Sequence, residues 1–138
     1  MPYLTIKNIS AQIDGGRIVF NMTFKNIGNG TAINLTTKYL EIANVLCPVH
    51  QTVLATYCCI QPFDVYLAVA RPDEECELSI AQDPASNLLG NSDCFCVTVK
   101  YSDMKGQQYT QAFAVYFDVA DSGNIEIVRK IINNPELQ

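Results

Sequence analysis

The stretch from Arg17 to Leu40 constrains the fold more than any other part of the chain. Apolar residues occupy every second position before a turn rich in glycine and asparagine, and a second alternation follows it. The alternating positions are Ile18, Phe20, Met22 and Phe24 before the turn and Ile33, Leu35, Thr37 and Tyr39 after it. A period of two is typical of a half-buried strand, and Gly28, Asn29 and Gly30 tolerate the positive φ of a chain reversal. The stretch predicts two strands joined by a tight turn, with further strands covering their apolar face.

Short strands and turn signals continue on both sides of this stretch. Asp14-Gly15-Gly16 predicts a hairpin between a first strand over Tyr3–Ile9 and the strand that begins at Arg17. A change of phase near Leu40 and Ile42 predicts a bulge or a strand end. From 43 to 70 the pattern loosens, and we expect a loop with a short irregular element or helical turn over 49–57, followed by a strand around 64–70.

The second half of the chain predicts four more elements. An acidic turn over 71–75 precedes a strand over Cys76–Ala81, and a long connection follows over 82–92. Asp103-Met104-Lys105-Gly106 closes a hairpin between strands over Cys94–Ser102 and Gln107–Val119. The core-facing positions of this hairpin are Phe95, Val97, Val99, Tyr101, Tyr109, Phe113, Val115 and Phe117. Residues 124–132 fit either a strand or a short helix.

About seven short strands without a convincing amphipathic helix predict an all-β chain. The leading architecture is an immunoglobulin-like antiparallel β-sandwich with a cysteine-rich insert at about 43–62, and a β-barrel is the alternative. A length of 138 residues suits a single domain over 1–138. A chain of this size buries roughly two thirds of its unfolded surface without metals or disulfides.

Charge and hydropathy exclude several classes of partner. The net charge is −5 and the nine basic residues are scattered singly, which argues against nucleic acid and against an anionic membrane face. No apolar run approaches the roughly 20 residues of a spanning helix, so we expect no membrane insertion by this chain. Met1-Pro2-Tyr3-Leu4 lacks the features of a signal peptide, although a leader or anchor removed from a longer precursor stays an open alternative. The polar, weakly charged composition favours an extracellular, cell-surface or virion location.

Six cysteines are the most unusual feature of the composition: Cys47, Cys58, Cys59, Cys76, Cys94 and Cys96. None forms a Cys-x-x-Cys pair, so they fit a structural zinc site poorly, and their even number favours disulfides over free thiols. If Phe95 and Val97 face the core, Cys94 and Cys96 point outward and need a covering segment. We expect the insert to cover that face and to be bonded there, with Cys76 joining from a neighbouring strand or loop. For an intracellular source, the oxidised cytoplasm of a thermophile is the simplest explanation.

The only histidine, His50, lies in the insert beside Cys47, close in sequence to Cys58-Cys59. A cysteine-dependent redox or metal-binding protein centred on these residues is therefore the alternative function. No third orienting group or oxyanion site accompanies them, and an exposed loop histidine is the simpler interpretation. We predict no catalytic residue, no metal and no cofactor.

Four Asn-x-Ser/Thr sequons fall within the first 36 residues, at Asn8, Asn21, Asn29 and Asn34. Eleven asparagines and fifteen serines plus threonines in 138 residues give about one such sequon by chance (11 × 15/138). Asn21 and Asn34 occupy positions opposite the apolar faces, where a glycan acceptor has to lie. The competing interpretation is that strands and turns favour threonine and asparagine anyway.

Two further surface features carry weaker hypotheses. Asp73, Glu74, Glu75 and Glu77, with Asp64 or Asp83, supply the hard oxygen ligands that calcium prefers, but no Asp-x-Asp-x-Asp-Gly spacing accompanies them, so a solvated acidic turn is favoured. The tyrosines expected outside the core, which offer a contact surface, are Tyr57, Tyr66 and Tyr116. Carbohydrate binding needs an aromatic platform that a chain without tryptophan supplies poorly.

The segment from Phe24 to Leu35, FKNIGNGTAINL, resembles the N-x-G-x-G-x-A-x-N turn of the CARDB-like group of immunoglobulin-like domains. The acidic turn at 71–74 and the hairpin at 99–109 fit the same pattern. Thr31 stands where proline is usual, and the insert at Cys47–Gln61 is longer and richer in cysteine. The resemblance implies a non-catalytic module of a bacterial, archaeal or archaeal-virus surface protein, used as a spacer or adhesive unit. We therefore predict a structural or interaction module that binds a protein partner or itself and is stabilised by disulfides.

Overall fold

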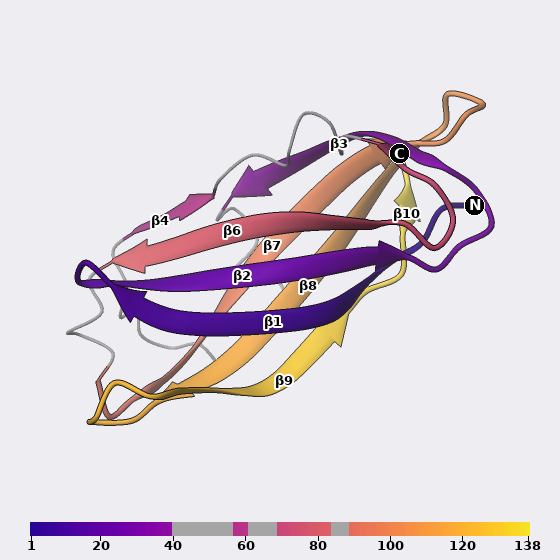
Figure 1. The fold of residues 1–138 in the computed structure, drawn as a ribbon. Coiled ribbons are helices and arrows are strands. Elements are labelled where there is room, and N and C mark those ends of the chain that lie inside the picture. The colour runs from indigo at the N-terminus through magenta and orange to yellow at the C-terminus, as the bar shows by residue number, and fades with distance from the viewer. Residues whose placement is uncertain (40–56, 61–68, 84–88) are drawn as a thin grey trace.

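The computed structural model describes residues 1–39, 57–60, 69–83 and 89–138, and all regular secondary structure in these ranges is β-strand (Figure 1). The strands are β1 (Leu4–Asp14), β2 (Arg17–Asn26), β3 (Ala32–Tyr39), β4 (Tyr57–Ile60), β5 (Val69–Ala70), β6 (Glu75–Asp83), β7 (Ser92–Ser102), β8 (Gln108–Val119), β9 (Ile125–Ile132) and β10 (Glu136–Leu137). Most of the insert at 43–62, the bulge expected near Leu40 and Ile42, and the helical turn expected over 49–57 lie outside the described residues, apart from β4.

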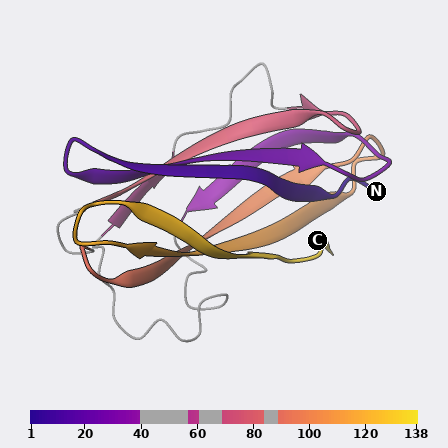
Figure 2. The ribbon, with the colours of Figure 1, turned by 60° about the horizontal axis from the view of Figure 1, so that its bottom comes forward.

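The strands form two antiparallel sheets that face each other, as Figures 1 and 2 show. The first sheet has the order β1-β2-β6-β4. The second has the order β10-β8-β7-β3-β5, with β9 pairing along β8 beyond β10. The orders β1-β2-β6-β4 and β8-β7-β3 are those of the two sheets of an immunoglobulin constant-type sandwich. The predicted fold class is confirmed, with β5, β9 and β10 added at the edges of the second sheet.

The two hairpins predicted from turn residues both form. Asp14 pairs with Arg17 around Gly15 and Gly16, whose φ values of 60° and 79° are those of a type I′ turn. Gly106 has a φ of 85° in the turn between β7 and β8. Residues 125–132 form the strand β9, which settles the choice between strand and helix for this segment.

Strands β2 and β3 both form, but they do not pair with each other. β2 pairs with β1 and β6 in the first sheet, while β3 pairs with β7 and β5 in the second, so the turn between them carries the chain across the sandwich. The register of β3 shifts between Ile33 and Thr36, and Asn34 there has a φ of 55°. Because of this bulge Ala32 is buried and Ile33 is only half-buried, so the predicted phase of β3 is wrong at its start.

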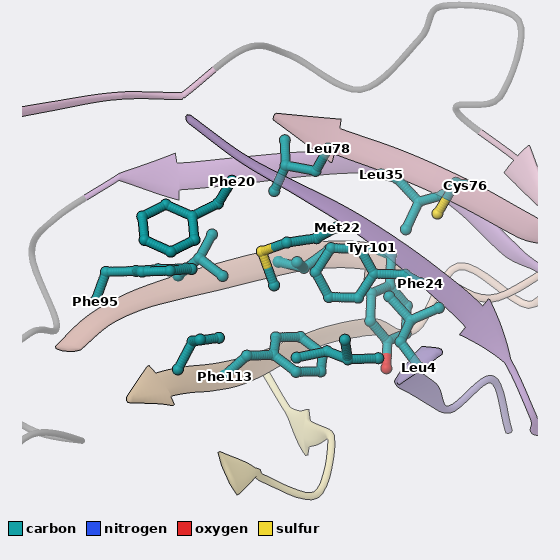
Figure 3. Packing of buried hydrophobic residues seen from close by; sticks show 14 of the residues in the cluster. Leu4, Phe20, Met22, Phe24, Leu35, Cys76, Leu78, Phe95, Tyr101 and Phe113 are labelled. Carbon is teal, nitrogen blue, oxygen red and sulfur yellow. The ribbon is translucent and has the colours of Figure 1, made fainter. Parts of the chain in front are cut away.

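The core lies between the two sheets (Figure 3). It contains the predicted faces of β2, β7 and β8. Phe20 packs against Phe95 and Phe117 with ring centroids 4.6 and 4.8 Å away, and Phe24 packs against Phe113 at 4.9 Å. Tilted and edge-on aromatic pairs of this kind each add about 0.5–1.5 kcal/mol beyond the area they bury. The alternation read from the sequence thus fixes which side chains hold the sheets together.

Two edge strands carry a bulge. In β1 the register shifts between Ile6 and Asn8, and in β9 it shifts around Val128, whose side chain is exposed. A bulge twists an edge strand and interrupts the row of free backbone groups that would otherwise pair with another chain. The sandwich therefore protects both of these edges by local geometry.

Candidate functional site

Three turns and both chain termini gather at one end of the sandwich, which we call the loop end. It comprises the β2–β3 turn (27–31), the acidic turn (71–74), the β7–β8 hairpin (103–107), the N-terminal residues 1–3 and the C-terminal residue Gln138 (Figure 1). Backbone hydrogen bonds tie these segments together, from Ile27 N–H to Tyr3 C=O (2.8 Å) and from Gln138 N–H to Gln108 C=O (2.8 Å). In immunoglobulin-like sandwiches the loops between strands cluster at the ends in this way and carry recognition.

Asn26 organises the β2–β3 turn from a fully buried position. Its Oδ1 accepts hydrogen bonds from the N–H groups of Tyr3 (3.1 Å) and Gly28 (3.0 Å). Its Nδ2 donates to the carbonyl groups of Gly30 (2.8 Å) and Ala70 (2.9 Å). The side-chain amide thus makes four hydrogen bonds to three chain segments, which leaves it no capacity for a ligand.

The two glycines of this turn are required by close approach rather than by backbone angle. Positive φ was expected for Gly28, Asn29 and Gly30, but none of them has it. A Cβ added at Gly28 would lie 2.7 Å from the backbone nitrogen of Tyr3, and one at Gly30 would lie 3.3 Å from the Pro2 ring. The two glycines therefore leave room for the N-terminal segment to pack against this turn.

The β7–β8 hairpin is fixed by Asp103. Its Oδ1 accepts hydrogen bonds from the N–H groups of Lys105 and Gln107 (both 2.9 Å), and its Oδ2 accepts one from the Tyr109 hydroxyl (3.1 Å). Loss of hydration alone would raise the pKa of Asp103, but these donors outweigh it and the pKa is lowered. The pKa of Tyr109 is raised by desolvation and by the same hydrogen bond to the carboxylate. The Asp103 carboxylate therefore stabilises the turn through these three hydrogen bonds.

Gln111 joins the two sheets beneath the loop end. It is fully buried, its Nε2 donates to the carbonyl groups of Leu4 (2.6 Å) and Asn133 (2.9 Å), and its Oε1 accepts from Leu4 N–H (3.1 Å) and the Tyr101 hydroxyl (2.8 Å). Burial raises the pKa of Tyr101 well above its ordinary value, and the neighbouring Tyr109 and Tyr3 add to the shift. In the sequence, Gln111 only interrupts the alternating apolar residues between Tyr109 and Phe113.

The surface of the loop end combines exposed apolar side chains with a shallow depression. Met104 is 73% exposed at the tip of the hairpin, and Ile27 and Met1 are each 56% exposed. A depression of about 290 Å³ lies between the N-terminal segment and the hairpin, with Met1, Thr31 and Met104 among its lining residues. Flexible, polarisable methionine side chains suit a surface that adapts to a protein partner. Sequence reasoning did not single out this surface, because isolated apolar residues in turns carry no pattern.

The cysteines whose side chains are described do not come together. Cys76 is a free thiol packed in the core between the sheets, and burial raises its pKa to about 12. Cys94 lies outside this core, in a separate buried cluster with Ala114, Tyr116 and Ile131. The expectation that Cys94 points away from the core is confirmed. The expectation that Cys76 joins it on that face is wrong, because the alternation of β6 turns Cys76 inward.

The remaining cysteine predictions fall on residues whose side chains are not described. Cys47 and His50 lie outside the described residues. Cys58 and Cys59 are placed by backbone only, in β4, where they pair with Gln82 and Ala81 of β6. Cys96 is likewise placed only by its backbone, in β7. The disulfides proposed among these residues and the covering of the β7 face by the insert remain predictions.

All four sequon asparagines are exposed, but they do not share one surface. Asn8 and Asn21 lie on neighbouring strands of the first sheet, whereas Asn29 lies in the loop end and Asn34 forms the bulge of β3. Asn21 Oδ1 accepts a hydrogen bond from the Ser79 hydroxyl (2.7 Å), and Asn29 Oδ1 accepts one from the N-terminal ammonium (2.7 Å).

The acidic turn is held by ordinary surface interactions. Glu74 Oε1 accepts a hydrogen bond from Arg71 N–H (3.0 Å) and pairs with the guanidinium at 3.4 Å, and Glu75 pairs with Lys7. Within the described ranges, no group of three or more acidic, histidine or cysteine side chains is arranged to hold a metal.

Tyr116 lies outside the main core. The guanidinium carbon of Arg129 lies over its ring, 4.6 Å from the ring centre. The side chain of Tyr57 and all of Tyr66 lie outside the described residues.

These features define an immunoglobulin-like β-sandwich protein with an apolar loop end. Comparisons with protein-family models, with curated proteins and with solved structures find no match to this chain. In the part of the chain that is described, no helix has the length and hydropathy needed to cross a membrane. The CARDB-like resemblance of the β2–β3 turn therefore stays a prediction that rests on its residues.

Proposed function

We propose that this protein is a non-catalytic interaction module of a cell-surface or virion protein, and that it binds a protein partner or a second copy of itself through the loop end. The observation that carries the proposal is the exposure of Met104, Met1 and Ile27 at the loop end, where Met104 and Met1 line a depression. Exposed apolar side chains rimmed by polar ones are typical of protein contact sites. The hairpin that presents Met104 also projects beyond the neighbouring strands (Figure 1).

The chemistry of three polar side chains at and beneath the loop end supports a non-catalytic role. Asn26 and Gln111 each use their amide groups in four hydrogen bonds to the protein. Asp103 uses its carboxylate to hold three donors of its own hairpin. A catalytic acid or base needs access to substrate and a pKa near the working pH. Asn26 and Gln111 are buried amides that do not titrate, and the pKa of Asp103 is lowered, away from neutral pH.

The position of the termini favours an adhesive module over an in-line spacer. Both termini lie at the loop end, where Gln138 pairs beside Gln108 and Met1 lies against Gly28 and Gly30 (Figure 1). A spacer strung along a chain needs its two termini at opposite ends. In a longer chain this domain would project to one side of its attachment point.

Charge substitutions at the two ends of the sandwich test the proposal. Met104→Glu and Ile27→Glu change the loop end, and Leu89→Glu and Ile13→Glu are matched controls among the exposed apolar residues outside it. The readouts are self-association by sedimentation velocity and binding of the labelled protein to surface preparations of its natural source. We expect each loop-end variant to weaken association about tenfold or more, which is the loss of one well-placed apolar anchor.

Two results would overturn this function. Equal association by all four variants and the parent protein would exclude the loop end. Stoichiometric bound metal, or a thiol-dependent activity that is lost on substitution of Cys47, Cys58 or Cys59, would replace it with the redox or metal-binding alternative.

A further inference from the structure

Two sequons lie side by side on the outer face of the first sheet. In the β1–β2 register Asn8 is opposite Thr23 and Ser10 is opposite Asn21, so the sequons Asn8-Ile9-Ser10 and Asn21-Met22-Thr23 pair reciprocally. The middle residue of each points the other way, because Met22 is buried in the core and Ile9 packs against it. The asparagine and the hydroxyl residue of each sequon therefore share the outer face.

Both asparagine side chains are accessible on this face. Asn8 and Asn21 are exposed, and in the described part of the chain neither Nδ2 donates a hydrogen bond to the protein. Asn21 uses only its oxygen, which accepts a hydrogen bond from Ser79. Asn26, five residues further along the same strand, shows the contrast: it is buried and its Nδ2 makes two hydrogen bonds. β2 thus carries one asparagine with a structural role, Asn26, and one that is accessible, Asn21.

We infer that Asn8 and Asn21 are acceptors for N-linked glycan, which makes the outer face of the first sheet a glycan-bearing surface. In the transfer, which a glycosyltransferase catalyses, Nδ2 attacks the anomeric carbon of a lipid-diphosphate-linked sugar. The bond from that carbon to the diphosphate oxygen breaks, the lipid diphosphate leaves with the electron pair, and the amide gives one proton to a base of the transferase. The result is a neutral C–N linkage on the strand.

Such a surface has a physical consequence for the edge of the sheet. β1 is the outermost strand of the first sheet, and its bulge at Lys7 immediately precedes Asn8. A bulky hydrophilic group at Asn8 hinders pairing of this edge with another chain, in addition to the bulge itself. Both acceptors lie on strands outside the loop end, so the inference goes beyond the proposed contact function and does not depend on it.

Peptide mapping of the protein from its natural source tests the inference directly. Trypsin places the two acceptors on separate peptides, Asn8–Arg17 and Ile18–Lys25, neither of which contains another asparagine. The peptide 26–38 carries Asn26, Asn29 and Asn34 and reports on them separately. We expect sugar-bearing forms of the first two peptides, identified by fragment ions that locate the added mass on Asn8 and Asn21.

Sequon variants produced in the natural host or in a glycosylating secretory host complete the test. Asn8→Gln and Asn21→Gln remove the acceptors, whereas Ser10→Ala and Thr23→Ala keep each asparagine and remove only the sequon. Each substitution is expected to abolish the added mass on its own peptide alone. Only unmodified Asn8–Arg17 and Ile18–Lys25 from the natural source would overturn the inference, whatever the state of peptide 26–38. That outcome would leave the loop-end proposal standing, because its own test is association.

Discussion

Replacing Asn26 with leucine removes the centre of the loop end without changing the size of the side chain much. The hydrogen bond to the Ala70 carbonyl is buried, and leaving that carbonyl unpaired costs roughly 1–3 kcal/mol. The other three bonds are partly buried, so water can replace part of each, and we assign about 0.5–1.5 kcal/mol to each. The total is roughly 2.5–7.5 kcal/mol. Burial of the apolar leucine offsets about 1 kcal/mol, so we expect Asn26→Leu to lower the free energy of unfolding by about 4 kcal/mol.

Urea unfolding followed by far-ultraviolet circular dichroism measures this loss, with tyrosine fluorescence as a second probe. Asn21→Leu is the matched control, because it makes the same change on the same strand at an exposed position. We expect the control to change stability by no more than about 0.5 kcal/mol. For a chain of this length, 4 kcal/mol corresponds to a fall in Tm of roughly 12–16 °C. Equal effects of the two substitutions would refute the argument that Asn26 holds three segments together.

Asn26→Asp refines the same test through pH. The substitution replaces the Nδ2 donor with a carboxylate oxygen that faces the Gly30 and Ala70 carbonyl groups. Burial and these facing oxygens raise the pKa of the introduced carboxyl above its unfolded value of about 3.9, and they outweigh the Tyr3 and Gly28 N–H groups at Oδ1, which act in the opposite direction. The folded state then binds the proton more tightly than the unfolded state. The deficit relative to the parent is therefore smallest below about pH 4 and grows as the pH rises through the folded pKa. A deficit that shrinks with rising pH would contradict this environment.

Three further substitutions or modifications probe the remaining contacts. Gln111→Leu leaves buried backbone groups of Leu4 unpaired, and urea unfolding should show a loss of about 3–5 kcal/mol. Gly28→Ala should lower Tm more than Gly106→Ala. A Cβ at position 28 clashes with the backbone of the N-terminal segment, which we expect to lower the free energy of unfolding by about 2–3 kcal/mol. A Cβ at position 106 meets open space and adds only the strain of a positive φ, about 1–2 kcal/mol. Iodoacetamide at pH 8 should label Cys76 only after unfolding, because burial raises its pKa to about 12, and mass spectrometry of native and urea-treated protein compares the two states.

The sequence predicts the strands well because their alternation encodes burial. Phe20, Phe24 and Phe113 were placed in the core by period alone, and the structure buries all three. The hairpins were predictable because Gly15, Gly16 and Gly106 supply the positive φ that their turns use. Both signals are local, which is why they can be read from one chain.

The partners of each strand could not be predicted in the same way. The alternation of apolar residues indicates which face of β2 is buried. It does not indicate that the next strand, β3, belongs to the opposite sheet. The positive φ also fell outside the glycine motif, at Asn34, where a bulge lets Ala32 and Leu35 both reach the core. Such a bulge depends on the packing of the whole sandwich, so the residues around it carry no separate signal. The inward position of Cys76 follows from the phase of β6 and was predictable from Leu78, which shares its face.

Gln111 shows why an exception to a pattern is informative. Its amide offers Leu4 both a donor and an acceptor, the same pair that a neighbouring strand residue offers across a ladder. β1 thereby gains a polar link to the second sheet at a point where it has no strand on that side. A buried amide is costly unless every group is paired, and here Tyr101 and Asn133 complete the pairing. A polar residue that interrupts an otherwise apolar face therefore predicts a backbone partner on the facing sheet, although the identity of that partner requires the fold.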